Sequence, residues 1–245
     1  GEADLMVAGG VESMTRAPWV MAKPGTPWAR PGEVVDTSLG WRLVNPRFRD
    51  ADAPITLSMG ETAEEVAALD GITRAESDAF ALRSHQRAVA AIDGGRFTDE
   101  IVPVGEVTTD EIPRRNSSLE KLAGLKTVFR SGGVVTAGSS SPLSDGAAAV
   151  LVASEAAVER HGLTPRARIV TAASAGVPPH LMGLGPVPAT EKALSRAGWT
   201  AGDLDAVELN EAFAVQSLAV IRRLKLDEER VNADGGAIAI GHPLG

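Results

Sequence analysis

The stretch "DAVELNEAFAVQSLAVIRRL", residues 205–224, joins a short apolar segment directly to a longer one with helical spacing. Residues 205–210 are typical of a strand, and residues 211–224 predict a helix. The same alternation precedes it: a strand at 146–154, a helix to Gly162, a strand at 167–177 and a helix at 188–198. Strands that alternate with helices predict an α/β layered sheet.

The rest of the chain adds elements of both kinds. "DLMVAGG", residues 4–10, predicts a buried strand, and "GAAAVLVAS", residues 146–154, is apolar throughout, as expected of a strand buried on both faces. "EIVPVGEV", residues 100–107, is a further strand candidate. Helices are predicted at 60–71, at 73–95 with a capping box of Thr73 and Glu76, and at 117–125 with a capping box of Ser117 and Glu120. Residues 18–54 predict an irregular excursion with four aromatic side chains as apolar anchors: Trp19, Trp28, Trp41 and Phe48.

Composition excludes several classes of protein. The 245 residues are 44% hydrophobic and 23% charged, and their net charge of −8 argues against nucleic acid or an anionic membrane as the main partner. No apolar run is long enough to cross a bilayer, and no signal peptide is recognisable. The chain has no cysteine, which excludes disulfides, and its four histidines are scattered, so we expect no metal site and a cytoplasmic location. A start at Gly1 and an end inside a glycine-rich loop predict that the chain is a fragment.

The loop "GGAIAIGHPLG", residues 235–245, presents a single polar side chain, His242. Gly241 and Pro243 restrict its backbone, and the nearby glycines permit a ligand or a second loop to approach closely. Histidine acts as a general base or a hydrogen-bond donor near neutral pH. A structural role and a catalytic role for His242 are about equally supported by the loop alone.

Two other motifs each allow two interpretations. Asn210 and Glu211 follow a predicted buried strand, where ligands bind in α/β sheets. Asn210 either caps the following helix or points its amide into a cleft to hold a water or a carbonyl oxygen. In "TAGSSSPLSDGAAAV", residues 136–150, the serines before Pro142 either form a flexible turn or contact a polar ligand.

Six motifs, in their order and spacing, resemble those of the thiolase family over essentially the whole chain. They are "VAGGVESMTRAP", "GRFTDEIVPV", "TAGSSSPLSDGAAAV", "GLGPVPA", "ELNEAFA" and "GGAIAIGHPLG". The resemblance implies a CoA-dependent acyltransferase that cleaves a 3-oxoacyl-CoA with free CoA. It also implies two family cysteines outside the 245 residues, one before "VAGG" and one after "GHPLG", so that this chain alone is expected to be inactive.

The resemblance also assigns roles to individual residues. His242 would activate the nucleophilic thiol and donate to the thioester oxygen, and Asn210 would fix a water beside that oxygen to complete an oxyanion hole. Ser141 would contact the pantetheine arm of CoA, and Arg114 would lie near its adenine end. Three apolar side chains would line the channel of the pantetheine arm: Phe129, Met182 and Phe213.

One position departs from the family pattern. In thiolases that form acetoacetyl-CoA, a histidine precedes the helix that begins near residue 60, and Ser58 stands there in this chain. The departure favours a degradative enzyme, similar to β-ketoadipyl-CoA thiolases. The alternatives are a biosynthetic acetoacetyl-CoA thiolase and a non-catalytic thiolase-like protein that binds acyl-CoA or lipid.

The expected architecture is therefore a layered αβαβα fold of thiolase type with an inserted loop domain, incomplete in this chain. Residues 1–11 and 144–164 would belong to the first α/β half, residues 12–143 to the loop domain, and residues 165–245 to the second half. A homodimer or homotetramer is expected, with CoA and acyl-CoA as substrates and no cofactor.

Overall fold

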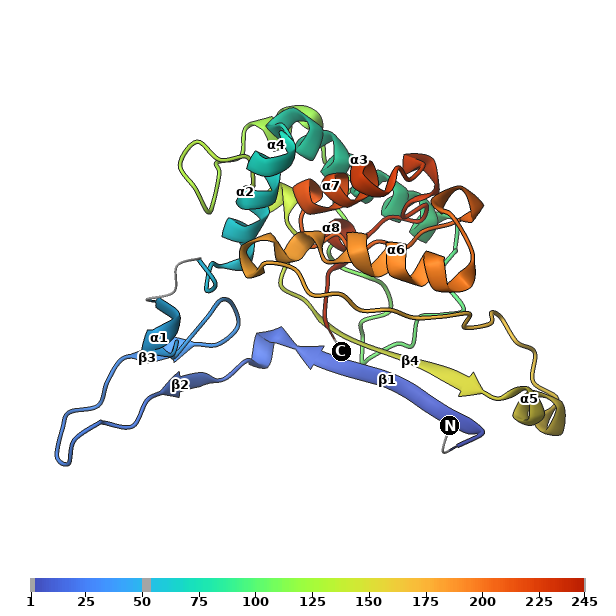
Figure 1. Ribbon diagram of the computed structural model, residues 1–245, viewed down its shortest axis with the longest axis horizontal. Coiled ribbons are helices and arrows are strands. Elements are labelled where there is room, and N and C mark those ends of the chain that lie inside the picture. The colour runs from blue at the N-terminus through green and yellow to red at the C-terminus, as the bar shows by residue number, and fades with distance from the viewer. Residues whose placement is uncertain (1–2, 50–53, 245) are drawn as a thin grey trace.

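The computed structural model describes residues 3–49 and 54–244, without the side chain of Arg49. The parts of the predictions above that concern residues 1–2, 50–53 and 245 lie outside these ranges. A helical body occupies one side of the molecule, a long two-stranded ribbon lies beneath it, and an arm extends from one end of the ribbon (Figure 1).

The helical body contains the five helices predicted at 60–71, 73–95, 117–125, 188–198 and 211–224, with shifted ends, and one short helix that was not predicted, at 237–240. Short 3₁₀ turns connect them, including η2 (Ala137–Ser139), η3 (Pro179–Leu184), η4 (Ala201–Asp203) and η5 (Glu228–Arg230). The α-helices of the body are α2 (Met59–Asp70), α3 (Arg74–Asp93), α4 (Leu119–Ala123), α6 (Pro186–Ala197), α7 (Ala214–Leu224) and α8 (Ala237–Ile240).

Helix boundaries follow from capping residues. The predicted capping box of Thr73 and Glu76 at the start of α3 is confirmed. Ser58 forms a second box with Glu61 at the start of α2. The box predicted for Ser117 and Glu120 is wrong, because α4 begins one residue later, with Ser118 accepting the Lys121 N–H. Sequence spacing alone does not fix which of two adjacent serines adopts the cap conformation.

The ribbon pairs two segments that lie far apart in the sequence. β1 (Leu5–Ser13) and β4 (Asp145–Ala153) run antiparallel, with Leu5 opposite Ala153 and Ser13 opposite Asp145. Helix α5 (Glu155–His161) follows the end of β4 (Figure 1). Both strands are as expected, but the prediction that they are buried is wrong in this chain: Val7 is 72% exposed and Val150 is 62% exposed. Their apolar faces lack covering layers among the described residues.

Three other predicted strands form no ladder. Within the described ranges, residues 167–177 form no strand and no bridge, and residues 100–107 form only one isolated bridge, between Val104 and Val107. Residues 205–210 contribute a single parallel bridge, from Val207 to Val231. A ladder needs a neighbouring strand along its whole length, and in the described part of this chain these segments have at most one bridged residue pair each.

The arm carries the aromatic residues of the irregular excursion. It begins after η1 (Met14–Arg16) and contains β2 (Trp19–Met21) paired with β3 (Val34–Asp36), followed by α1 (Pro46–Arg49). The predicted apolar anchors are wrong, because Trp19, Trp28, Trp41 and Phe48 are all exposed. The arm projects away from the body instead of packing onto it (Figure 1).

One core holds the helical body together. Val66 and Ala67 of α2, and Phe80 of α3, pack with α7 and with Ile238 of α8. Residues on both sides of the predicted boundary between loop domain and second half therefore share this core. The predicted domain limits stay a prediction. Within the described ranges, no helix combines the length and the apolar character needed to cross a membrane.

Candidate active site

The side chains of Asn210 and His242 meet, although 32 residues separate them in the sequence. Asn210 Nδ2 lies 3.2 Å from His242 Nε2. The amide nitrogen of asparagine only donates, so His242 Nε2 is the acceptor in this contact. Asn210 is exposed and His242 is half-buried, so the pair is open to solvent and to a ligand.

Asn210 does not cap the following helix. Helix α7 begins at Ala214, three residues later than the sequence predicted, and its N-cap residue Phe213 makes no side-chain cap bond. Residues 211–213 stay outside the helix, and Phe213 is extended and forms a bridge with Ser140. The carboxamide of Asn210 is therefore free to meet His242.

The loop that carries His242 is fixed by contacts with the beginning of β4. The His242 N–H donates to Ser144 Oγ over 3.0 Å. Gly241, which precedes His242, has φ +92°, and a Cβ there would lie 2.3 Å from the same Ser144 oxygen. Only glycine combines this left-handed backbone with so close an approach. The position of the imidazole thus depends on Ser144 and on Gly241.

Ser141 and the predicted apolar residues lie on neighbouring segments. The Ser141 N–H donates to the carbonyl of Ala212 over 3.0 Å, and Ala212 lies two residues after Asn210. The rings of Phe129 and Phe213 pack edge to face with centroids 6.1 Å apart. Met182 lies in η3 and is 47% exposed. The structure therefore brings Ser141, Phe129 and Phe213 to the segments around Asn210.

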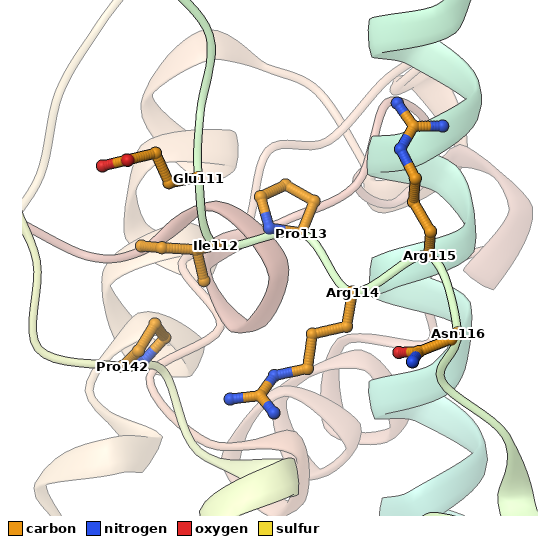
Figure 2. Close-up of a pocket in the computed structure, with 7 residues that line it drawn as sticks. All are labelled: Glu111, Ile112, Pro113, Arg114, Arg115, Asn116 and Pro142. Atoms are coloured by element: carbon orange, nitrogen blue, oxygen red, sulfur yellow. The ribbon is translucent and has the colours of Figure 1, made fainter. Parts of the chain in front are cut away.

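Arg114 lies in an open cavity beside the segment that carries Ser141. The cavity has a volume of about 630 Å³ and is lined by residues 111–116 and by Pro142. Figure 2 shows the side chains of Arg114 and Arg115 pointing in different directions, with that of Arg114 extending toward the side of Pro142. Arg115 pairs with Asp93. Arg114 has no carboxylate within ion-pair distance in the described residues, so it is available to an anion.

His85 holds the backbone of the Arg114 segment in place. Its Nδ1 accepts the Arg114 N–H over 3.3 Å, and its side chain is buried in α3. Burial, with a smaller contribution from the positive charge of Arg114, holds the pKa of His85 below its usual value of 6.5. The imidazole must be deprotonated at Nδ1 to accept this bond.

This arrangement predicts a pH-dependent stability. Because the pKa of His85 is lowered by folding, the unfolded state binds more protons, and the free energy of unfolding should fall as pH drops below about 6.5 through the lowered pKa. The variant His85→Gln should lose this dependence. Urea unfolding of both proteins between pH 5 and 8 measures it, and parallel curves for the two would contradict the prediction.

Sequence reasoning missed several residues that build the site. It named Glu211 only as a neighbour of Asn210, and it did not single out Ser84, Ser144 or Asn232. Asn232 has φ +50° and stands at the start of "NADGG", a turn signal that could have marked it. Glu208, two residues before Asn210, has a pKa raised by burial and by the charges of Asp234 and Glu211.

The described residues contain no group of three or more side chains that could hold a metal ion.

Two family models match this chain. The family model for the thiolase N-terminal domain matches residues 1–156, and the model for the thiolase C-terminal domain matches residues 163–245. Together the two models cover nearly the whole chain, and the chain belongs to the thiolase family.

Among characterised relatives, the 3-oxoadipyl-CoA/3-oxo-5,6-dehydrosuberyl-CoA thiolase of Escherichia coli K12 is 53% identical over 100% of this chain and 63% of its own length. A β-ketoadipyl-CoA thiolase of Pseudomonas aeruginosa is 51% identical over the same shares. The crystal structure of human mitochondrial 3-ketoacyl-CoA thiolase in complex with CoA matches with a TM-score of 0.89 and 43% identity, over 100% of this chain and 61% of that one. The expected thiolase-type fold is thus confirmed, and the chain spans less than two thirds of the length of these relatives.

Proposed function

We propose that this chain is part of a degradative thiolase, a CoA-dependent acyltransferase that cleaves a 3-oxoacyl-CoA with CoA into acetyl-CoA and a shortened acyl-CoA. The observation that carries the proposal is the 3.2 Å contact between Asn210 Nδ2 and His242 Nε2. The family membership and the high identity to β-ketoadipyl-CoA thiolases support it.

His242 would act first as a base. Its Nε2 accepts a hydrogen bond in the structure, so the same atom can accept a proton from a thiol. A free thiol has a pKa of about 8.5, and removal of its proton by a neighbouring imidazole supplies the reactive thiolate. The 245 residues contain no cysteine, so in this proposal the thiol belongs to another part of the enzyme.

Once His242 Nε2 carries the proton, it and Asn210 Nδ2 are both hydrogen-bond donors, so the hydrogen bond between them is lost. An oxygen atom that accepts from both restores the lost hydrogen bonds. The thioester oxygen gains negative charge when the thiolate attacks, and two converging donors stabilise that charge more than they stabilise the ground state. Asn210 would act either directly or through one water.

CoA would extend from this pair along the segments that carry Ser141 and Phe213. Ser141 lies beside Pro142, which also lines the cavity of Arg114. A pantetheine arm is mostly apolar, and the edge-to-face pair of Phe129 and Phe213 offers an apolar surface for it. The guanidinium of Arg114, which pairs with no carboxylate among the described residues, would contact the phosphates of the nucleotide end. Met182 would complete the channel.

The contacts of Ser58 support the degradative direction over a biosynthetic one. Its hydroxyl donates to Glu61 Oε2 over 2.8 Å and accepts the Glu61 N–H over 3.3 Å. Ser58 is therefore engaged in capping α2 and is not free to contact a short acyl thioester. A longer acyl group, such as a 3-oxoadipyl chain, can fill the space that a histidine would occupy.

The complete enzyme should cleave 3-oxoadipyl-CoA in the presence of CoA more efficiently than acetoacetyl-CoA. We expect a cytoplasmic homodimer or homotetramer that needs no cofactor beyond CoA as substrate. The 245-residue chain alone should bind CoA thioesters but not turn them over. Release of acetyl-CoA, measured by chromatography, tests the proposal. Turnover by the 245-residue chain alone would refute it. Absence of turnover by the complete enzyme would also refute it and would favour a non-catalytic acyl-CoA-binding protein.

A further inference from the structure

A buried carboxylate contacts Asn232 and the segment that leads to His242. Glu211 follows Asn210 in the sequence and is only 2% exposed. Its Oε2 accepts from Ser84 Oγ over 2.6 Å and from the Ile238 N–H over 3.2 Å, while its Oε1 accepts from Asn232 Nδ2 over 2.8 Å. In the described part of the chain, no lysine, arginine or histidine forms an ion pair with it.

Asn232 connects Glu211 to the segment that leads to Asn210. Its Oδ1 accepts the Leu209 N–H, and its Nδ2 donates to the Leu209 carbonyl, both over 2.7 Å. These two bonds fix the orientation of the amide, so the nitrogen must face Glu211. Leu209 immediately precedes Asn210, and the backbone on both sides of Asn210 is therefore held by this network.

The other half of the network holds the segment that leads to His242. The Ser84 hydroxyl accepts the Gly236 N–H over 3.2 Å while it donates to Glu211. A Cβ on Gly236 would lie 2.2 Å from the carboxyl carbon of Glu211, so this backbone lies directly on the carboxylate. From Ile238, whose N–H also reaches Glu211, helix α8 runs to Ile240, and the Gly241 turn then presents His242.

We infer that Glu211, Ser84 and Asn232 form a positioning network that fixes the distance between Asn210 and His242. An acceptor-only carboxylate is suited to the task because three donors from three segments converge on it. Glu211, Ser84 and Asn232 touch no reacting atom. They act through Asn210 and His242, which do. The inference deepens the proposed function and rests on it for its kinetic consequence, but its structural consequence can be measured without turnover.

Glu211→Gln tests the network with little change in shape. The glutamine nitrogen must face either Asn232 Nδ2 or the Ile238 N–H, and each contact then places two donors against each other. Asn232 cannot turn to compensate, because both of its amide atoms are bonded to Leu209. The variant therefore loses at least one of the three hydrogen bonds, and the two segments separate.

Ser84→Ala provides a milder test with a closely matched control. Ser77 lies in the same helix α3 and is buried like Ser84, but its hydroxyl has no hydrogen-bond partner among the described residues. Ser77→Ala therefore removes the same atom from the same helix without touching the network. If Glu211→Gln fails to fold, the comparison of Ser84→Ala with Ser77→Ala still tests the positioning network.

The first measurement is NMR of the complete enzyme without substrate. The side-chain 15N–1H signals of Asn210 and the Nε2 signal of His242, assigned with an Asn210→Ala variant, report on their contact. In Glu211→Gln and Ser84→Ala the His242 Nε2 signal should move toward its position in Asn210→Ala, whereas in Ser77→Ala it should match the unsubstituted enzyme. Equal signals in Ser84→Ala and Ser77→Ala would overturn the inference.

The second measurement is kinetic and uses the complete enzyme. A misplacement of about 1 Å costs roughly 10²-fold in rate, so kcat should fall about 10- to 100-fold in Glu211→Gln and Ser84→Ala, with KM for CoA within about twofold. A network that only stabilises the fold would leave kcat unchanged well below the melting temperature, and that result would refute the inference. Failure of the unsubstituted enzyme to turn over would refute the proposed function alone, because the NMR result stands without it.

Discussion

Replacing His242 with alanine is expected to lower kcat of the complete enzyme by roughly 10³-fold or more. The substitution removes the base that takes the thiol proton and one of the two donors to the thioester oxygen. Asn210 remains, so its contact with the oxygen preserves some catalysis. KM for CoA should change little, because His242 lies at the reacting end of the proposed channel and not at Arg114 or Ser141.

A second histidine serves as the control for this variant. His161 lies in the last turn of α5, at the far end of the ribbon, and is exposed. His161→Ala should retain the kcat of the unsubstituted enzyme. Steady-state thiolysis rates measured for both variants test the role of the imidazole, and a His242→Ala enzyme within tenfold of the unsubstituted rate would remove His242 from the mechanism.

Gly236→Ala should be among the most destabilising single changes in the chain. The added methyl group would lie 2.2 Å from the carboxyl carbon of Glu211 and 2.4 Å from its Oε1. Glu211 is buried and held by three donors, so neither group can move without breaking hydrogen bonds. We expect a loss of about 3 kcal/mol or more in the free energy of unfolding, from overpacking and from donors left without acceptors.

Gly202→Ala provides the matching control for this stability measurement. A Cβ on Gly202 would meet only Thr200 Oγ1, at an ordinary contact distance of 3.7 Å. This variant should unfold within about 0.5 kcal/mol of the unsubstituted chain, as expected of a surface change. Urea titration compares the two, and a Gly236→Ala chain as stable as Gly202→Ala would show that the backbone does not lie against Glu211 as described.

Local sequence signals predicted the helices well. The capping box of Thr73 and Glu76 and the glycines at 71, 162 and 198 place the ends of α2, α3, α5 and α6 nearly where the structure has them. These signals work because capping satisfies backbone groups within a few residues of the helix end. The start of α7 was wrong by three residues, since a bridge from Phe213 to the distant Ser140 outweighs the helical pattern.

Strands were predicted less well, because their hydrogen bonds depend on partners far away in the sequence. The apolar pattern of residues 146–154 identified β4 but not its exposure, and residues 167–177 remain unpaired within the described ranges. The aromatic residues of the arm were expected to anchor it, yet Trp28 is fully exposed. Apolar composition marks residues that gain from burial, but it does not say which surface covers them.

The candidate site was predicted in part. The resemblance to thiolases pointed to Asn210, His242 and Ser141, and the structure places these residues on adjoining segments. Their roles stay a prediction. The supporting residues Ser84, Ser144 and Asn232 carry no motif that distinguishes them, because their importance arises from contacts between residues 21 to 152 positions apart in the sequence. Such contacts become visible only when the chain is folded.

A crystal structure of the complete enzyme with a bound 3-oxoacyl-CoA tests most directly whether Asn210 and His242 together receive the thioester oxygen. We predict that this oxygen lies about 3 Å from His242 Nε2, and that Asn210 Nδ2 reaches it directly or through a single water. A thioester oxygen bound by other groups, with the imidazole and the carboxamide turned away from it, would contradict the proposed mechanism.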